Sequence, residues 1–65
     1  MSFGTAIDLI KKGYQVSREA WDNVEVYMYL DHDGVISIMI DGNVRPFIAL
    51  VTSEDILTND WYLLA

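Results

Sequence analysis

The run from Phe3 to Trp21, FGTAIDLIKKGYQVSREAW, most constrains the fold because it contains a complete helix followed directly by an extended segment. Ser2 can cap this helix by accepting a hydrogen bond from a free amide, and Gly13 can adopt the left-handed conformation that ends it. One apolar helix face follows the i, i+3, i+4, i+7 spacing and comprises Phe3, Ala6, Ile7 and Ile10. A helix with one apolar face needs a partner layer, and the rest of the chain supplies one.

Short apolar segments separated by turn residues predict a set of strands after the helix. The expected strands are 14–18, 24–30, 35–40, 44–51 and 61–64, with a turn over 19–23 that presents Trp21. Two Asp-Gly turns, 31–34 and 41–43, connect the middle strands as hairpins. Pro46 has no amide donor, so its strand is expected at a sheet edge or with a bulge.

Thr52 opens a predicted one-turn helix before the last strand. Asp55 stands three residues later, which makes a capping box with Asp in place of Glu, and Leu57 is the expected buried anchor. We therefore predict one α+β domain over residues 1–65. An N-terminal helix packs on a small antiparallel sheet of about four to five short strands, and a short helical turn precedes the last strand.

Strand alternation divides the expected sheet into two faces. The core face carries Val24, Val26, Met28, Leu30, Ile36, Ile38 and Ile40. The outer face is unusually apolar for a surface in water: it carries Tyr27, Tyr29, Val35, Met39 and Phe47, and Tyr62 is a further candidate. Since large apolar surfaces mark interfaces, we expect a second copy of the chain to cover this face as a homodimer or homotetramer.

Composition favours the same conclusion, because 52% of the 65 residues are hydrophobic and none is cysteine. A domain this small is marginally stable without a disulfide, a metal or a partner subunit. Disulfides are excluded, and the single His32 leaves little for a transition-metal site, so a partner subunit is the expected source of additional stability.

A net charge of −6 with only four lysines and arginines argues against DNA or RNA binding, which needs a basic surface. A pocket for one or two phosphates remains possible, because one arginine and a few backbone amides suffice. No apolar run approaches the roughly 20 residues of a membrane span, and no signal peptide is recognisable, so we expect a soluble intracellular protein.

Candidate chemical sites are few. The segment 31–36 resembles part of an EF-hand, but Tyr29 and Ile40 would occupy ligand positions, which excludes calcium. His32 lacks an oriented partner for base catalysis. Trp21 and Trp61 are either core or interface residues, or a stacking surface for a base with Arg18 reaching a phosphate.

Two blocks of sequence resemble the phage Thoeris anti-defence sponge family of the second type. The first block contains Phe3, Gly4, Ala6, Ile7, Lys12, Gly13, Val16, Arg18 and Trp21, followed by Asp22-Asn23. The second is the run 52–61, TSEDILTNDW, which resembles the family's C-terminal signature Ser-Gln-x-Asp-hydrophobic-Leu-Ala-x-Asp-Trp, with Ser53 in place of its Gln. A tryptophan of the family corresponds to Phe47, and four turn residues, 31–34, replace its long insert.

The resemblance implies an α+β protein that assembles as dimers or tetramers and sequesters a cyclic nucleotide signal without cleaving it. The ligand would be a cyclic ADP-ribose isomer or a cyclic dinucleotide in the host cytoplasm, with no cofactor or metal. The residues implied for the ligand site are Phe3, Arg18, Trp21, Phe47, Asp55 and Asp60. The alternative is an oligomeric module that inhibits or regulates a host or phage protein. Without a nucleophile–base pair or a metal set, an enzyme is not expected.

Overall fold

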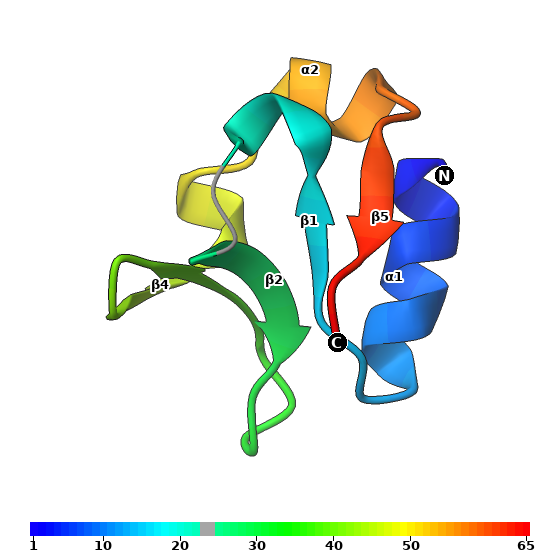
Figure 1. The fold of residues 1–65 in the computed structure, drawn as a ribbon. Coiled ribbons are helices and arrows are strands. Elements are labelled where there is room, and N and C mark those ends of the chain that lie inside the picture. Colours follow the sequence, from blue (N-terminus) through cyan, green and yellow to red (C-terminus); the bar gives the residue numbers. More distant parts are fainter. Residues whose placement is uncertain (23–24) are drawn as a thin grey trace.

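The structure is a computed structural model that describes residues 1–22 and 25–65 (Figure 1). A nine-residue helix is followed by five short strands, two 3₁₀ turns and a second, one-turn helix. In chain order these are α1 (Phe3–Lys11), β1 (Val16–Arg18), η1 (Glu19–Trp21), β2 (Val26–Leu30), β3 (Ile36–Ile40), β4 (Asn43–Pro46), η2 (Phe47–Ala49), α2 (Ser53–Leu57) and β5 (Trp61–Leu63). The predicted α+β class is confirmed, including the short helix before the last strand.

All strand pairs are antiparallel, and the strand order in the sheet is β4-β3-β2-β1-β5. The last strand therefore lies beside the first, with Val16 opposite Leu63 and Arg18 opposite Trp61. Figure 1 shows β1 and β5 side by side, with α1 next to β5. This pairing brings the two ends of the chain, and both of its sequence motif blocks, to the same place.

Helix α1 has the ends that its sequence predicts. The Ser2 side chain accepts a hydrogen bond from the Thr5 amide, and Gly13 has a positive φ of 95° just beyond the helix. Ala6 and Ile10 are completely buried on the helix face that contacts the sheet. The helix thus covers the sheet with the face that the apolar spacing indicates.

The core lies between the helices and one face of the sheet, and it consists of Ala6, Ile10, Val16, Met28, Ile38 and Trp61. Met28 pairs with Ile38, while their neighbours Tyr27 and Met39 pair with each other and face the opposite side. That opposite face continues to Val44, which is 48% exposed. Tyr27 and Met39 are only half-buried, so the outer face remains partly apolar within one chain.

The prediction of one strand over 44–51 is wrong in its second half. Strand β4 ends at Pro46, and the amides of Leu50 and Val51 both donate to the Phe47 carbonyl at 3.0 and 2.9 Å, which closes η2. Strand β4 is an edge strand, so the edge position expected for Pro46 is confirmed. Phe47 was expected on the outer face, but η2 turns its side chain against the hydrophobic core.

Two expected core residues are exposed. Leu57 was the predicted anchor of α2, but it is 81% exposed, because α2 turns Asp55 inward in its place. Leu30 is 37% exposed, at the end of β2 next to the hairpin turn. The predictions made for Asn23 and Val24 lie outside the described residues.

The turn between β3 and β4 gives a testable prediction about backbone strain. Gly42 has a φ of 86°, where a side chain is disfavoured even though the surrounding space is open. We expect Gly42→Ala to lower the free energy of unfolding by about 1 kcal/mol. The matched control is Gly4→Ala in α1, where the nearest atom to a new Cβ is 3.9 Å away. Urea denaturation should show the control at or slightly above wild-type stability, and equal losses in both variants would contradict the argument.

Candidate functional site

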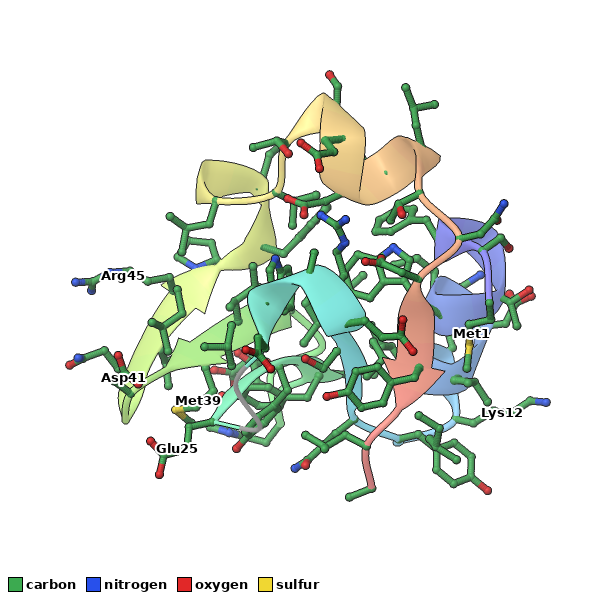
Figure 2. All side chains as sticks on the ribbon, turned by 45° about the horizontal axis from the view of Figure 1, so that its top comes forward. Met1, Lys12, Glu25, Met39, Asp41 and Arg45 are labelled. Carbon is green, nitrogen blue, oxygen red and sulfur yellow. The ribbon has the colours of Figure 1, made fainter. Side chains whose placement is uncertain are left out.

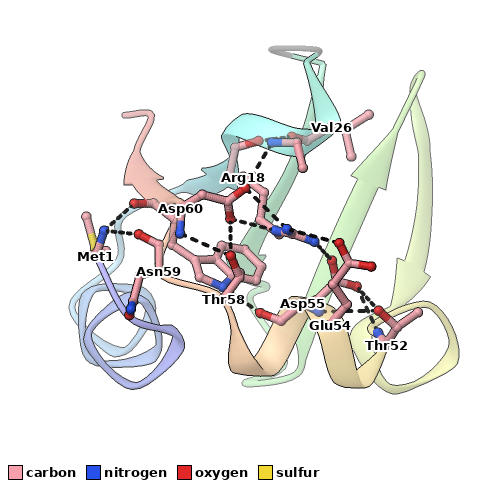
Figure 3. Close-up of polar contacts among 12 residues, drawn as sticks. Met1, Arg18, Val26, Thr52, Glu54, Asp55, Thr58, Asn59 and Asp60 are labelled. Atoms are coloured by element: carbon pink, nitrogen blue, oxygen red, sulfur yellow. Dashed lines mark hydrogen bonds and ion pairs between the residues drawn. The ribbon is translucent and has the colours of Figure 1, made fainter.

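Arg18, at the end of β1, is surrounded by carboxylates from the C-terminal segment (Figure 3). Its Nε and Nη2 atoms donate to the two oxygens of Asp60 at 2.7 and 3.2 Å. Its Nη1 atom donates to Oδ1 of Asp55, and Glu54 Oε1 lies 3.9 Å from Nη2. We call Arg18, Glu54, Asp55 and Asp60 the Arg18 cluster.

Local sequence positions the first carboxylate of the Arg18 cluster. Thr52 and Asp55 form the predicted capping box of α2, in which Oδ2 of Asp55 accepts from the Thr52 amide at 2.8 Å and from its hydroxyl at 3.0 Å. The other oxygen of Asp55 remains directed at Arg18. The Asp55 side chain therefore both caps α2 and forms an ion pair with the buried guanidinium of Arg18.

Asp60 is held by a second set of local contacts. It accepts from the hydroxyl of Thr58 at 3.1 Å and from the amide of Ala20 in η1 at 3.1 Å. The main-chain nitrogen of Met1 donates to the carbonyls of Asn59 and Trp61 at 3.0 and 2.7 Å, on either side of Asp60. These contacts fasten the start of β5 to the rest of the domain (Figure 3).

The charges in the Arg18 cluster stabilise one another. Arg18 and Asp55 are each only 5% exposed. Hydrogen bonds from Arg18 lower the pKa of Asp60, and those same bonds raise the pKa of Arg18 despite its burial. Burial alone would raise the pKa of Asp55, but hydrogen bonds from Thr52 and Arg18 outweigh it, so that pKa is lowered.

Aromatic side chains lie next to the Arg18 cluster. Trp61 contacts Phe3 with ring centroids 5.5 Å apart and Trp21 with centroids 5.2 Å apart, the latter edge-on at 81°. The indole nitrogen of Trp61 donates to the Asp55 carbonyl at 2.8 Å. Trp61 is 1% exposed and is therefore a core residue, whereas Phe3 and Trp21 are half-buried. We call Phe3, Trp21 and Trp61 the aromatic group.

Five of the six residues predicted for a ligand site meet here: Phe3, Arg18, Trp21, Asp55 and Asp60. Phe47 is partly buried against the core, and within residues 1–22 and 25–65 no ring contact joins it to the aromatic group. The residues implied for the ligand site did not include Glu54, and the sequence left Trp61 open between a core or interface residue and a stacking surface. The position of Trp61 at the end of the C-terminal motif was the available signal.

The aromatic group offers rings on which a ligand could stack, and the Arg18 cluster beside it is a network of paired charges. The guanidinium of Arg18 has carboxylate partners inside its own chain, so a phosphate would have to compete with them. The half-buried rings of Trp21 and Phe3 are free of that competition and offer apolar surface at the edge of the core. Among the described residues, no group of three or more histidine, cysteine, aspartate or glutamate side chains has the geometry to hold a metal ion.

The architecture places the chain in the class of small α+β domains built on one antiparallel sheet. Comparison with protein families narrows the class. The Tad2-like family, described as the Thoeris anti-defense 2-like domain, matches residues 1–64, and the chain belongs to this family. No curated protein matches the chain.

The family membership confirms the resemblance found in the two motif blocks and supports a phage anti-defence role. It also suggests interaction with an immune signal. Within residues 1–22 and 25–65, no helix has the length and apolar character needed to cross a membrane.

The lowered pKa values predict acid sensitivity. Because the pKa values of Asp55 and Asp60 lie below that of an unfolded aspartate, about 3.9, their stabilising effect is complete above that value. It is lost as the pH falls through the folded-state values, so we expect urea midpoints to drop below about pH 4.

A control variant distinguishes the acid sensitivity that comes from the Arg18 cluster from that of a third aspartate, Asp31. The pKa of Asp31 is also lowered, by hydrogen bonds from the Val35 and Asp33 amides and the Ser37 hydroxyl. The urea midpoint of the variant Asp31→Asn should therefore still fall at acid pH by most of the amount seen in the wild type. A pH-independent midpoint in this variant would assign the effect to the hairpin turn instead.

Proposed function

We propose that this protein sequesters a cyclic nucleotide immune signal, either a cyclic ADP-ribose isomer or a cyclic dinucleotide, and holds it without cleaving it. The observation that carries the proposal is the meeting of the aromatic group and the Arg18 cluster at one place in a chain of the Thoeris anti-defense 2-like family. Such a protein would act in the host cytoplasm, where it would lower the free concentration of the signal. No cofactor is required.

Stacking is the main source of affinity in this proposal. Trp21 lies edge-on to Trp61, which holds its ring in place from the core side. Stacking of a base on an aromatic side chain contributes about 1–3 kcal/mol. Phe3 contacts the same buried tryptophan, so both half-buried rings have a fixed orientation before a ligand arrives.

The phosphates would be bound by backbone amides and by Arg18. Since Arg18 already binds two aspartates, we propose that it mainly positions the site and only its remaining hydrogen-bonding capacity reaches the ligand. A second copy of the chain would complete the pocket, as a homodimer or homotetramer. The half-buried outer face with Tyr27 and Met39 supports this assembly.

A ligand-release experiment tests the proposal. The purified protein is mixed with cyclic ADP-ribose isomers and cyclic dinucleotides, the bound fraction is filtered and heated, and the released compounds are identified by mass spectrometry. We expect one of them to be recovered intact. Recovery of a changed product would indicate an enzyme, and retention of none would remove the proposal.

A substitution tests the stacking surface. We expect Trp21→Ala to weaken binding of the retained signal by at least about tenfold, because one stacked base is lost. The control is Tyr14→Ala, which removes an aromatic side chain that is 43% exposed and outside the aromatic group. Calorimetry on folded variants checks both, and equal affinities in the two variants would contradict the assignment of Trp21.

A second candidate function is a module that binds a host or phage protein. Its support is a stretch of exposed apolar residues from η2 through α2: Ile48 at 80%, Leu50 at 43%, Ile56 at 46% and Leu57 at 81%. Purification from infected cells distinguishes the candidates. A stoichiometric protein partner that is lost in Leu57→Ser favours this second function, whereas a small molecule retained by the same variant favours the first.

A further inference from the structure

The two edges of the sheet differ in how they are covered. On β5, the carbonyl of Trp61 accepts from the main-chain nitrogen of Met1 at 2.7 Å, and α1 lies alongside the strand (Figure 1). On β4, the opposite edge, every residue of Asn43–Pro46 is exposed. Among the turn and loop hydrogen bonds of residues 1–22 and 25–65, none involves a main-chain group of β4. The edge of β4 is therefore open in a single chain, and an open edge is a template for pairing with another strand.

The turn before β4 determines which of its main-chain groups point outward. The two turn residues, 41–42, have positive φ angles of 49° and 86°, as in the two-residue hairpin turns whose flanking residues form a hydrogen-bonded pair. Those flanking residues are Ile40 and Asn43. By alternation the next pair, Met39 and Val44, is not hydrogen-bonded. The amide and the carbonyl of Val44 therefore point away from β3 and toward solvent.

The charged side chains of this edge complement those of a second copy. Figure 2 shows Asp41 and Arg45 pointing outward on the same side of the molecule, away from Met1. Neither belongs to an ion pair in the part of the chain that the structure describes. An antiparallel pair of identical edges would bring each of these charges toward the opposite charge of the other copy.

The residues of β4 also select the register of such a pair. With Val44 opposite the partner's Val44, both residues exchange their hydrogen bonds, and Arg45 lies diagonal to the partner's Asp41, about 7–8 Å away and within reach of its long side chain. With Val44 opposite the partner's Pro46, the two copies of Arg45 would face each other, and Pro46 has no amide to donate. Arg45 and Pro46 hinder pairing with most strands, so the first register favours a second copy over an unrelated strand.

We propose that β4 pairs antiparallel with β4 of a second copy, with Val44 opposite Val44 of the partner subunit, and joins the two sheets into one. The apolar row of Tyr27, Met39 and Val44 on the outer face then continues across the two-fold axis into the partner's row. This contact is at the sheet edge and leaves the outer faces of the dimer free to pack on a second dimer. It goes beyond the proposed function, because it requires no ligand.

Hydrogen exchange of one amide in ligand-free protein tests the pairing. A single four-residue edge buries less than the about 1,200 Å² of a standard interface, so we expect a weak dimer with a dissociation constant of about 100 µM. Exchange of the Val44 amide should slow about fourfold between about 10 µM and about 1 mM protein, because only the monomer exposes it. Amides of the other hairpin turn, 31–34, should show no such dependence. The absence of a dimer at millimolar concentration in sedimentation experiments, or a dimer without protection of the Val44 amide, overturns the proposal.

A matched pair of variants tests the predicted ion pair. Asp41→Asn and Asp33→Asn each remove one exposed negative charge, and asparagine also adopts the left-handed conformation of position 41. A smaller net charge alone would strengthen both dimers equally. Loss of the contact with the partner's Arg45 should instead weaken the Asp41→Asn dimer by about threefold, while the Asp33→Asn dimer is as tight as the wild type or tighter. Equal changes in the two variants would contradict the assigned register.

The two-fold axis allows a stronger test. A charge at position 44 would lie opposite its own copy, so Val44→Lys should show no dimer at millimolar concentration. The control Val35→Lys adds the same charge directly before β3, at a valine with the same exposed fraction of 48%, and should keep the dimer. Equal dimerisation of the two variants would place the interface elsewhere and overturn the proposal. Since no ligand is present, this outcome is separate from that of the ligand-release experiment.

Discussion

Arg18→Met is expected to unfold most of the protein at 37 °C. The substitution keeps much of the side-chain volume but leaves Asp55, which is 5% exposed, and the partly buried Asp60 without their cation. Removing one partner from a buried ion pair costs about 3–5 kcal/mol, because the remaining charge is neither solvated nor paired. A domain of 65 residues has a total stability of about 3–10 kcal/mol, so the loss is comparable to the whole.

Circular dichroism during urea and thermal unfolding measures this effect. The control is Arg45→Met, which removes the same type of charge from an exposed position on β4 and should change stability by less than about 0.5 kcal/mol. If Arg18→Met were as stable as Arg45→Met, the buried ion pairs would contribute nothing to the fold. Arg18 would then be available for a ligand, as the sequence-based interpretation held.

Trp61→Ala is the second substitution with a large expected effect. It removes the largest buried side chain, together with its ring contacts to Phe3 and Trp21 and its hydrogen bond to the Asp55 carbonyl. Replacing a buried tryptophan by alanine costs about 3–5 kcal/mol, so we expect a molten or unfolded chain.

A graded control separates packing from hydrogen bonding at this position. Trp61→Phe keeps an aromatic ring against Phe3 but leaves the Asp55 carbonyl without its indole donor. We expect an intermediate loss of about 1–3 kcal/mol, measured by the same urea denaturation. A loss in Trp61→Phe as large as that in Trp61→Ala would show that the hydrogen bond, and not the ring packing, dominates.

These variants also bear on the ligand proposal. Phe3 and Trp21 contact a tryptophan whose orientation depends on the Asp55 carbonyl, and Asp55 is held by Arg18. A substitution at Arg18 would therefore displace the half-buried rings even without touching a ligand. Binding measurements on Arg18 variants are informative only where the variant is shown to be folded.

Local sequence patterns determined the elements of this fold. The cap at Ser2, the left-handed Gly13 and the capping box of Thr52 and Asp55 were all predicted correctly. Each depends on contacts between residues at most four positions apart, or on the conformational freedom of one residue. The hairpin turns were predictable for the same reason.

The same local patterns failed where a distant contact decided the outcome. The run 44–51 has the apolar content of a strand, but the edge position of β4 and the packing of Phe47 on the core end it at Pro46. Leu57 has the expected type for an anchor, yet Arg18 draws Asp55 inward and leaves Leu57 on the surface. The alternation of apolar and polar residues along a segment does not show which face of that segment a charged residue distant in the sequence will contact.

The sequence by itself therefore determined the α+β class, the family, the helix ends and five residues that converge. Only the tertiary structure decided which contacts those residues make. Arg18 forms ion pairs with aspartates 37 and 42 positions away, and Trp61 is buried in the core whereas Trp21 is half-buried. The physical reason is the pairing of β1 with β5, which joins the two ends of the chain through contacts that no local periodicity encodes.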